Sequence, residues 1–177
     1  MKSTIITVQS QTAGEERTNM TTALFPGSFD PVTKGHESIV KKALPMFDKI
    51  IVAIGENTSK KTMFSLQQRL QWLQDTFKDC KNVEIDSYNC LTTDYCKKKN
   101  AQFILRGLRD TADFQYEKNI SDINTMLDSS IETVFLLADK QESTISSSFV
   151  REMLLFGKDV QMFLPKDVII PKKDISD

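Results

Sequence analysis

The sequence has few of the residues that build metal sites and disulfide frameworks. Its 177 residues include one histidine and three cysteines, and the cysteines (Cys80, Cys90 and Cys96) lack C-x-x-C spacing. An odd number of cysteines with a single histidine as co-ligand argues against both a disulfide scaffold and a zinc site. Free thiols without a recognisable signal peptide are typical of the cytoplasm, where we expect the protein to work.

Long hydrophobic runs and an excess of one charge are also missing. The longest apolar runs, residues 50–54 and 134–138, are far too short to span a bilayer. The formal net charge is −1 and no basic stripe is present, which argues against a duplex nucleic-acid surface or a membrane-binding helix. The length and composition indicate an ordinary soluble globular protein with one domain.

The first 19 residues differ from the rest of the chain. They are polar and show no core-forming pattern, so we expect a disordered N-terminal tail over residues 1–19 and a single domain over residues 20–177. The alternative is that residues 4–8 add an edge strand to the domain.

From residue 20 onward, short apolar runs alternate with helical periodicity. Strands are expected at residues 21–25, 49–54, 83–86, 103–105 and 132–137. Helices are expected after residue 34, after Ser65, and over residues 92–99, 111–127 and 147–156, the last ended by Gly157. This alternation predicts an α/β fold: a doubly wound, mainly parallel five-stranded sheet with helices on both faces. Ligands of such sheets bind beyond the carboxyl ends of the strands, where the loops should converge.

The common sequence signatures of nucleotide binding are absent. Neither the Walker pattern G-x-x-x-x-G-K-[ST] nor G-x-G-x-x-G occurs. This excludes a P-loop NTPase and a dinucleotide-binding protein with the usual fingerprint. A phosphate ligand would have to be held by other segments.

The single histidine, His36, ends a turn rich in Gly, Pro, Ser and Asp that begins at Pro26. This turn lies between the first expected strand and the first expected helix. Such a junction offers backbone N–H groups and a helix dipole to a bound anion. With Ser28 in the same turn, His36 is a candidate phosphate contact, although a single histidine taken alone is more often a surface or core residue.

Three further segments follow strands and carry phosphate-binding chemistry. Arginines beside a glycine can bind phosphate bidentately, and serines at a helix N-terminus can cradle polyphosphate. Each segment also has a structural interpretation, as surface charge or as a helix N-cap. The segments are Lys60-Lys61, Arg106-Gly107-Leu108-Arg109 and Ile145-Ser146-Ser147-Ser148.

The segment that ends at His36 and the segment with the three serines together resemble motifs of the nucleotidylyltransferase superfamily. Thr33-Lys34-Gly35-His36 is similar to its T/H-x-G-H motif, and residues 145–148 with Arg151 are similar to its I-S-S-x-x-x-R segment. Within that superfamily the chain resembles the phosphopantetheine adenylyltransferase family from about residue 21 to residue 165. The segments that carry this resemblance are P-G-S-F-D-P at 26–31, S-K-K-T-M-F at 59–64, R-G-L-R at 106–109, and D-F-Q-Y-E at 113–117 with Asn124.

The resemblance implies a Rossmann-like fold and transfer of AMP from ATP to 4'-phosphopantetheine, which yields dephospho-coenzyme A and pyrophosphate. It also implies Mg²⁺ as the metal, a homohexamer, and feedback binding of coenzyme A. Two alternatives stay open: a cytidylyltransferase of the same fold with another phosphate acceptor, and a nucleotide-binding module without turnover.

The resemblance also implies roles for individual residues. His36 would stabilise the transition state, with Lys60 and Arg106 as further catalytic residues. The acceptor phosphate would be held by Ser28, Lys60 and Arg106, and Thr92 would contact the pantetheine arm through its backbone. Family members often carry an aromatic residue shortly before the triple serine, whereas residues 138–144 contain none. The residues implied in ATP binding are Ser28, Phe29, His36, Gly107, Leu108, Arg109, Glu117, Glu142, Ser143, Thr144, Ile145, Ser146, Ser147 and Ser148.

Overall fold

Strands and helices alternate along the whole described part of the chain. The computed structural model describes residues 20–56 and 61–171. The strands are β1 (Thr22–Gly27), β2 (Lys49–Gly55), β3 (Val83–Tyr88), β4 (Phe103–Leu108) and β5 (Glu132–Leu137). The helices are α1 (Lys34–Ala43), α2 (Leu66–Phe77), α3 (Thr92–Lys99), α4 (Thr111–Leu127), α5 (Ser147–Leu155) and the 3-10 turn η1 (Gln161–Phe163).

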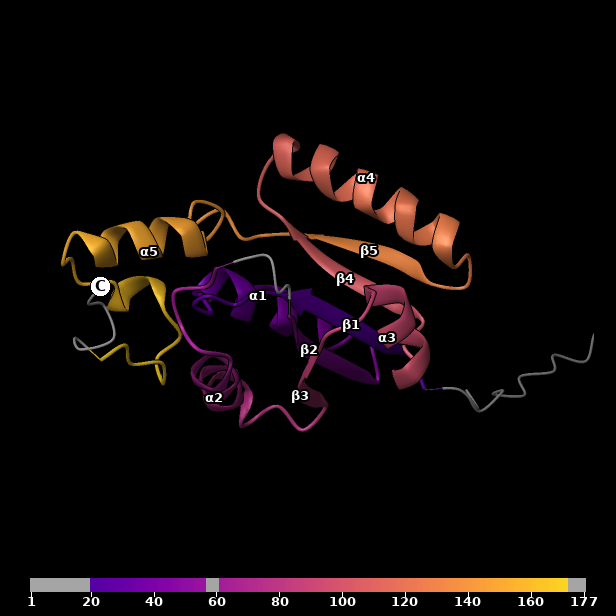
Figure 1. Ribbon diagram of the computed structural model, residues 1–177, viewed down its shortest axis with the longest axis horizontal. Coiled ribbons are helices and arrows are strands. Elements are labelled where there is room, and N and C mark those ends of the chain that lie inside the picture. The colour runs from indigo at the N-terminus through magenta and orange to yellow at the C-terminus, as the bar shows by residue number, and fades with distance from the viewer. Residues whose placement is uncertain (1–19, 57–60, 172–177) are drawn as a thin grey trace, which may run out of the picture.

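The five strands form one parallel sheet in the order β3-β2-β1-β4-β5 (Figure 1). The chain therefore winds outward from β1 in both directions, as the βα alternation predicts. A large apolar cluster includes side chains of α1, α2 and α5, and a smaller one includes Tyr95 and Cys96 of α3. The central strands β1 and β2 contribute to both clusters, so the sheet is covered on both faces.

Several expected boundaries are confirmed, whereas the strands β1, β3 and β4, which end at the site, run two or three residues further than expected. Strand β5 and helices α3 and α4 have the expected bounds, and Gly157 follows α5 with a positive φ of 65°. Strand β4, expected to end at Leu105, continues to Leu108 because Arg106, Gly107 and Leu108 pair in register with the end of β5. These three residues therefore belong to the strand rather than to the loop after it.

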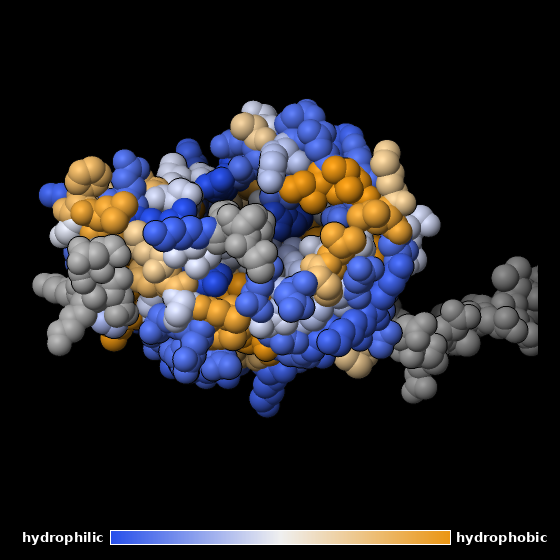
Figure 2. All heavy atoms as spheres, viewed as in Figure 1, coloured by the Kyte–Doolittle hydropathy of each residue, from blue (hydrophilic) through white to orange (hydrophobic). Residues whose placement is uncertain are grey.

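The exposed surface of α4 is unusually apolar. Ile123, Met126 and Leu127 are 57%, 86% and 53% exposed, and Leu137 at the end of β5 is 71% exposed. Figure 2 shows apolar side chains gathered over this helix. Such a patch on one helix is typical of a surface that binds another protein.

Two expectations fall on residues that the structure does not describe. The predicted disordered tail at residues 1–19 lies outside the described residues, as does Lys60. Among residues 20–56 and 61–171, no helix is both long and apolar enough to cross a membrane.

Candidate active site

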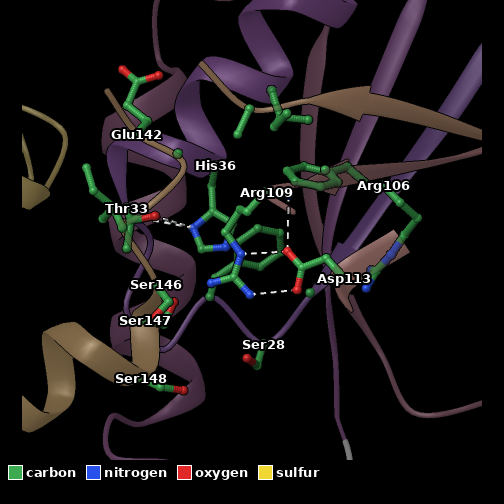
Figure 3. Close-up of a pocket in the computed structure, with 18 of the residues that line it drawn as sticks. Ser28, Thr33, His36, Arg106, Arg109, Asp113, Glu142, Ser146, Ser147 and Ser148 are labelled. Atoms are coloured by element: carbon green, nitrogen blue, oxygen red, sulfur yellow. Dashed lines mark hydrogen bonds and ion pairs between the residues drawn. The ribbon is translucent and has the colours of Figure 1, made fainter. Parts of the chain in front are cut away.

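A pocket opens at the carboxyl edge of the sheet, where loops far apart in the sequence meet (Figure 3). The segments after β1, β4 and β5 converge there, as predicted for a doubly wound sheet. Expected site residues that line this pocket are Ser28, Phe29, His36, Arg106, Gly107, Arg109, Glu117, Glu142, Ile145, Ser146, Ser147 and Ser148. Leu108, Ser143 and Thr144 are not among its lining residues.

His36 is held in the first turn of α1 by contacts with Phe29 and Thr33. The ring packs edge-on against Phe29, with centroids 5.0 Å apart, and its Nδ1 accepts a hydrogen bond of 3.0 Å from the backbone N–H of Thr33. A backbone N–H can only donate, so Nδ1 carries no proton and the neutral ring is protonated at Nε2. The residue thus combines a capping-box contact with a fixed Nε2–H donor.

The charge state of His36 follows from its surroundings. Burial of the ring, together with the positive charges of Arg109 and Arg106, lowers the pKa of His36 to about 4. The imidazole is therefore uncharged at neutral pH. It acts in this pocket as a hydrogen-bond donor and adds no positive charge.

This pKa can be measured without ambiguity because the chain has one histidine. We expect the NMR signal of the His36 ring to titrate near pH 4, and Arg109→Ala to raise that midpoint by removing a nearby positive charge. Since the folded pKa lies below the usual 6.5, the unfolded chain binds a proton first as the pH falls. The free energy of unfolding should therefore decrease between about pH 6.5 and pH 4. A midpoint at 6.5 in the folded protein would contradict this description of the site.

Arg106 lies near the end of β4 and is fixed by three acceptors. Its Nε and Nη2 donate to the two carboxylate oxygens of Glu117 on α4, the first at 2.7 Å, and its Nη1 donates to the carbonyl oxygen of Pro26 at 2.7 Å. Glu117 is the only buried residue of α4, with 9% exposure. Two residues expected to bind different substrates are therefore joined as a bidentate ion pair.

Arg109 is fixed in a similar way by Asp113. The guanidinium donates from Nε at 2.7 Å and from Nη2 at 2.9 Å to the two carboxylate oxygens (Figure 3). This contact lowers the pKa of Asp113, which stays ionised. Sequence reasoning assigned no role to Asp113, because Arg109 lies before α4 and the i,i+4 rule for charges on one helix does not apply.

Gly107 between the two arginines is required by packing. A Cβ at this position would lie 2.9 Å from Cγ1 of Ile39 on α1. The strand therefore approaches α1 more closely than a larger residue would allow. This approach brings Arg106 of β4, Arg109 just after it and His36 of α1 to one pocket.

The three serines stabilise the start of α5 and also line the pocket with polar groups. The N-cap interpretation is confirmed for Ser146, whose Oγ accepts from the N–H of Phe149 at 3.1 Å. Ser147 donates to the carbonyl oxygen of Pro31 at 2.8 Å, which ties α5 to the turn after β1. Ser146, Ser147 and Ser148 place the N-terminus of α5 at the pocket, where the helix dipole and free N–H groups favour a bound anion.

Asp30 joins three parts of the site and was missed by sequence reasoning. It is 3% exposed, and its carboxylate accepts from the N–H groups of Met63 at 2.9 Å and Phe64 at 3.0 Å. Its carbonyl oxygen accepts from Arg151 of α5 at 2.6 Å. Asp30 therefore holds the segment that follows Lys61 against the turn that carries Ser28. Lys61 itself is exposed.

A second pocket adjoins the first. It runs beneath α4, and Thr92 lies in its wall with Gly55, Tyr88, Ile104, Ile120, Ser121, Asn124 and Thr133. Both pockets share Pro26, Gly27, Arg106 and Glu117. The Arg106–Glu117 ion pair therefore lies between two pockets that open onto the same guanidinium. In the part of the chain that the structure describes, no group of three or more His, Cys, Asp or Glu side chains could hold a metal ion.

Known proteins resemble this chain over most of its length. The cytidylyltransferase-like family model matches residues 24–153. The phosphopantetheine adenylyltransferase of Flavobacterium johnsoniae is 51% identical over 153 residues, which cover 86% of this chain and 100% of the relative. The enzymes of the same name from Phocaeicola vulgatus and Nautilia profundicola are 47% and 43% identical, over 85% and 84% of this chain and 99% and 97% of the relatives.

Solved structures show the same fold. A bifunctional NMN adenylyltransferase/ADP ribose pyrophosphatase from Francisella tularensis superposes with a TM-score of 0.65 at 18% identity, over 85% of this chain and 46% of that one. At this identity the likeness concerns the fold alone. The family model and the identity to full-length relatives go further: the chain belongs to the phosphopantetheine adenylyltransferase family.

Proposed function

We propose that the protein transfers the adenylyl group of ATP to 4'-phosphopantetheine, releasing pyrophosphate and forming dephospho-coenzyme A for coenzyme A biosynthesis. The observation that carries this proposal is the pair of pockets that share Arg106, in a chain 51% identical to a relative of that name. Transfer of an adenylyl group requires that both substrates bind side by side, with a positive charge where their phosphates meet.

The reaction joins an oxygen of the acceptor phosphate to the α-phosphorus of ATP and breaks the bond from that phosphorus to the β-phosphate oxygen. The acceptor phosphate is already ionised at neutral pH, so no base needs to activate it. The protein must align the two phosphates and offset the charge that develops on pyrophosphate. This fits a site built from fixed donors, in which no side chain has to act as a nucleophile.

In this proposal ATP occupies the first pocket. Its phosphates lie between the N-terminus of α5 and Arg109, and the neutral His36 donates from Nε2 to an oxygen whose charge grows in the transition state. The base would pack against Ile39, Ala138 and Ile145, which line the same pocket. These aliphatic side chains and the nearby backbone would take the place of the aromatic residue that many relatives carry.

The acceptor occupies the second pocket, with its phosphate at Arg106. Ser28 lines the first pocket close to this junction and would add a donor, and Lys60 is proposed as the second cation on the incoming phosphate. Coenzyme A carries both a pantetheine arm and an adenosine moiety, so we propose that it can occupy the same pockets as a feedback ligand.

Mg²⁺ is proposed as the metal of the reaction, bound through the substrate. Three carboxylates line the first pocket: Asp113 and Glu117 are engaged by Arg109 and Arg106, and Glu142 is the third. One remaining side chain is too few for a cage. Mg²⁺ keeps several waters and is often held mainly by substrate phosphates. The described residues therefore fit an ion carried on the triphosphate better than an ion held by a protein cage, and no step here depends on a protein ligand.

We further propose that the protein assembles as a homohexamer in the cytoplasm. The apolar surface of Ile123, Met126, Leu127 and Leu137 supports a contact between copies of the chain, and the resemblance to the family supplies the number of subunits. The three free cysteines are compatible with a reducing compartment. Sedimentation velocity of the full chain measures the assembly directly.

The proposed reaction is tested by pyrophosphate release with ATP or CTP in the presence of 4'-phosphopantetheine. We expect rapid release with ATP and at most slow release with CTP. Activity with CTP alone would favour the cytidylyltransferase alternative. Binding of ATP with no pyrophosphate at any acceptor concentration would favour a module without turnover.

A further inference from the structure

The second pocket contains hydroxyl groups whose hydrogen-bonding capacity is not fully used among the described residues. Tyr88 at the end of β3, Thr92 at the start of α3 and Thr133 on β5 all line it. The Oγ1 of Thr133 is buried, and the described part of the chain offers it no partner. Buried hydroxyls are nearly always satisfied in folded proteins, so an unused one in a pocket wall points to a ligand.

Tyr88 is rigidly placed in this wall. Its ring stacks on Tyr95 with centroids 4.4 Å apart and an interplanar angle of 13°. The phenol lies so close to the end of β2 that a Cβ at Gly55 would be 3.1 Å from Oη. Burial raises the pKa of Tyr88, so the hydroxyl keeps its proton. The group is therefore a preorganised donor and acceptor with little freedom left to lose on binding.

The hydroxyls of Tyr88 and Thr92 lie 3.0 Å apart and form one hydrogen bond, in which either can be the donor. Two hydroxyls carry two protons, and one bond uses only one of them. No other side-chain hydrogen bond of either hydroxyl occurs among the described residues. The pair therefore retains one O–H donor and several lone pairs. It can donate a hydrogen bond to the C=O of an amide or accept one from its N–H.

We propose that Tyr88 determines acceptor specificity: its hydroxyl, paired with that of Thr92, hydrogen-bonds an amide of the pantetheine arm. This inference rests on the proposed function. The arm carries two secondary amides beyond its phosphate, and Arg106 fixes the phosphate end of the same pocket. Ile104 and Ile120 supply apolar lining for the carbon skeleton between them. The sequence resemblance implies only a backbone contact at Thr92, whereas the structure adds a pair of side-chain hydroxyls.

The test is Tyr88→Phe, which removes Oη and keeps the ring and its stack on Tyr95. We expect the Kd of 4'-phosphopantetheine, measured by calorimetry on the full chain, to rise about five- to tenfold, the usual effect of one lost hydrogen bond. The KM for the acceptor should rise in parallel, while the KM for ATP and kcat stay unchanged. Tyr95→Phe is the matched control because its hydroxyl binds Asp86 and does not line the pocket. It should leave the acceptor Kd unchanged.

A shortened acceptor distinguishes recognition of the amide from a change in pocket shape. For a phosphate that keeps the pantoyl skeleton and ends before the first amide, Tyr88→Phe should have no effect on Kd. An unchanged Kd for 4'-phosphopantetheine in Tyr88→Phe would overturn the inference, as would an equal loss for both acceptors. Because the Kd needs no turnover, these results are independent of whether the wild-type protein releases pyrophosphate, which tests the proposed function itself.

Discussion

Replacing His36 with alanine is expected to lower kcat by about 10²- to 10³-fold, the usual effect of removing one preorganised donor to a developing negative charge. The donor is Nε2–H, because Nδ1 is occupied by the N–H of Thr33. The KM values should change less than kcat, since the contact strengthens mainly in the transition state. Steady-state kinetics with both substrates varied measures the two effects separately.

His36 also stabilises the fold, so the alanine variant needs a structural control. Loss of the capping contact with Thr33 should reduce the free energy of unfolding by about 1 kcal/mol. His36→Gln is the matched control, because glutamine at this helix position can still accept from the N-cap N–H. We expect a Tm close to that of the wild type with kcat still strongly reduced, since the amide donor lies elsewhere. If the alanine variant kept the wild-type kcat, His36 would have no role in the chemical step.

The second large effect is expected at the Arg106–Glu117 ion pair. Arg106→Lys keeps the charge but cannot satisfy both Glu117 oxygens and the Pro26 carbonyl together. We expect kcat/KM for the acceptor to fall about 10- to 100-fold, which corresponds to one or two charge-assisted hydrogen bonds. The KM for ATP should change much less. Equal effects on both substrates would assign Arg106 to the nucleotide instead.

Glu117→Gln examines the same contact from the other side. The amide keeps the shape of the side chain but lacks the second acceptor oxygen and the charge, so the guanidinium loses its fixed orientation. We expect about a tenfold loss in kcat/KM for the acceptor. The double variant should lose much less than the product of the two single losses, because both changes break one interaction. Fully multiplicative losses would contradict a positioning role for Glu117.

The parts of the fold that were predictable depend on local signals. The start of α4 has a local signal in Asp110, whose side chain caps the helix, and the end of α5 has one in Gly157. The end of β4 did not follow, because its last three residues are strand only through pairing with β5. A polar Arg106 in a strand is unexpected until Glu117 and Pro26 are seen to satisfy it.

The candidate site shows the same difference between local signals and long-range contacts. His36 and the serines are visible in the sequence because each motif lies within a few residues at a strand-helix junction. The groups that fix them are not, since Asp30 reaches the segment at Met63 and Phe64 only in the folded protein. The lowered pKa of His36 likewise depends on burial of the ring and then on Arg109 and Arg106, which the sequence places some seventy residues away.

The most direct test follows the phosphorus atoms of ATP during a reaction with 4'-phosphopantetheine. Adenylyl transfer predicts that a label on the α-phosphorus appears in dephospho-coenzyme A, while a label on the γ-phosphorus appears only in pyrophosphate, with the two products formed in equal amounts. A γ-label in the acceptor product with ADP as the second product, or no product from ATP at all, would contradict the proposed reaction.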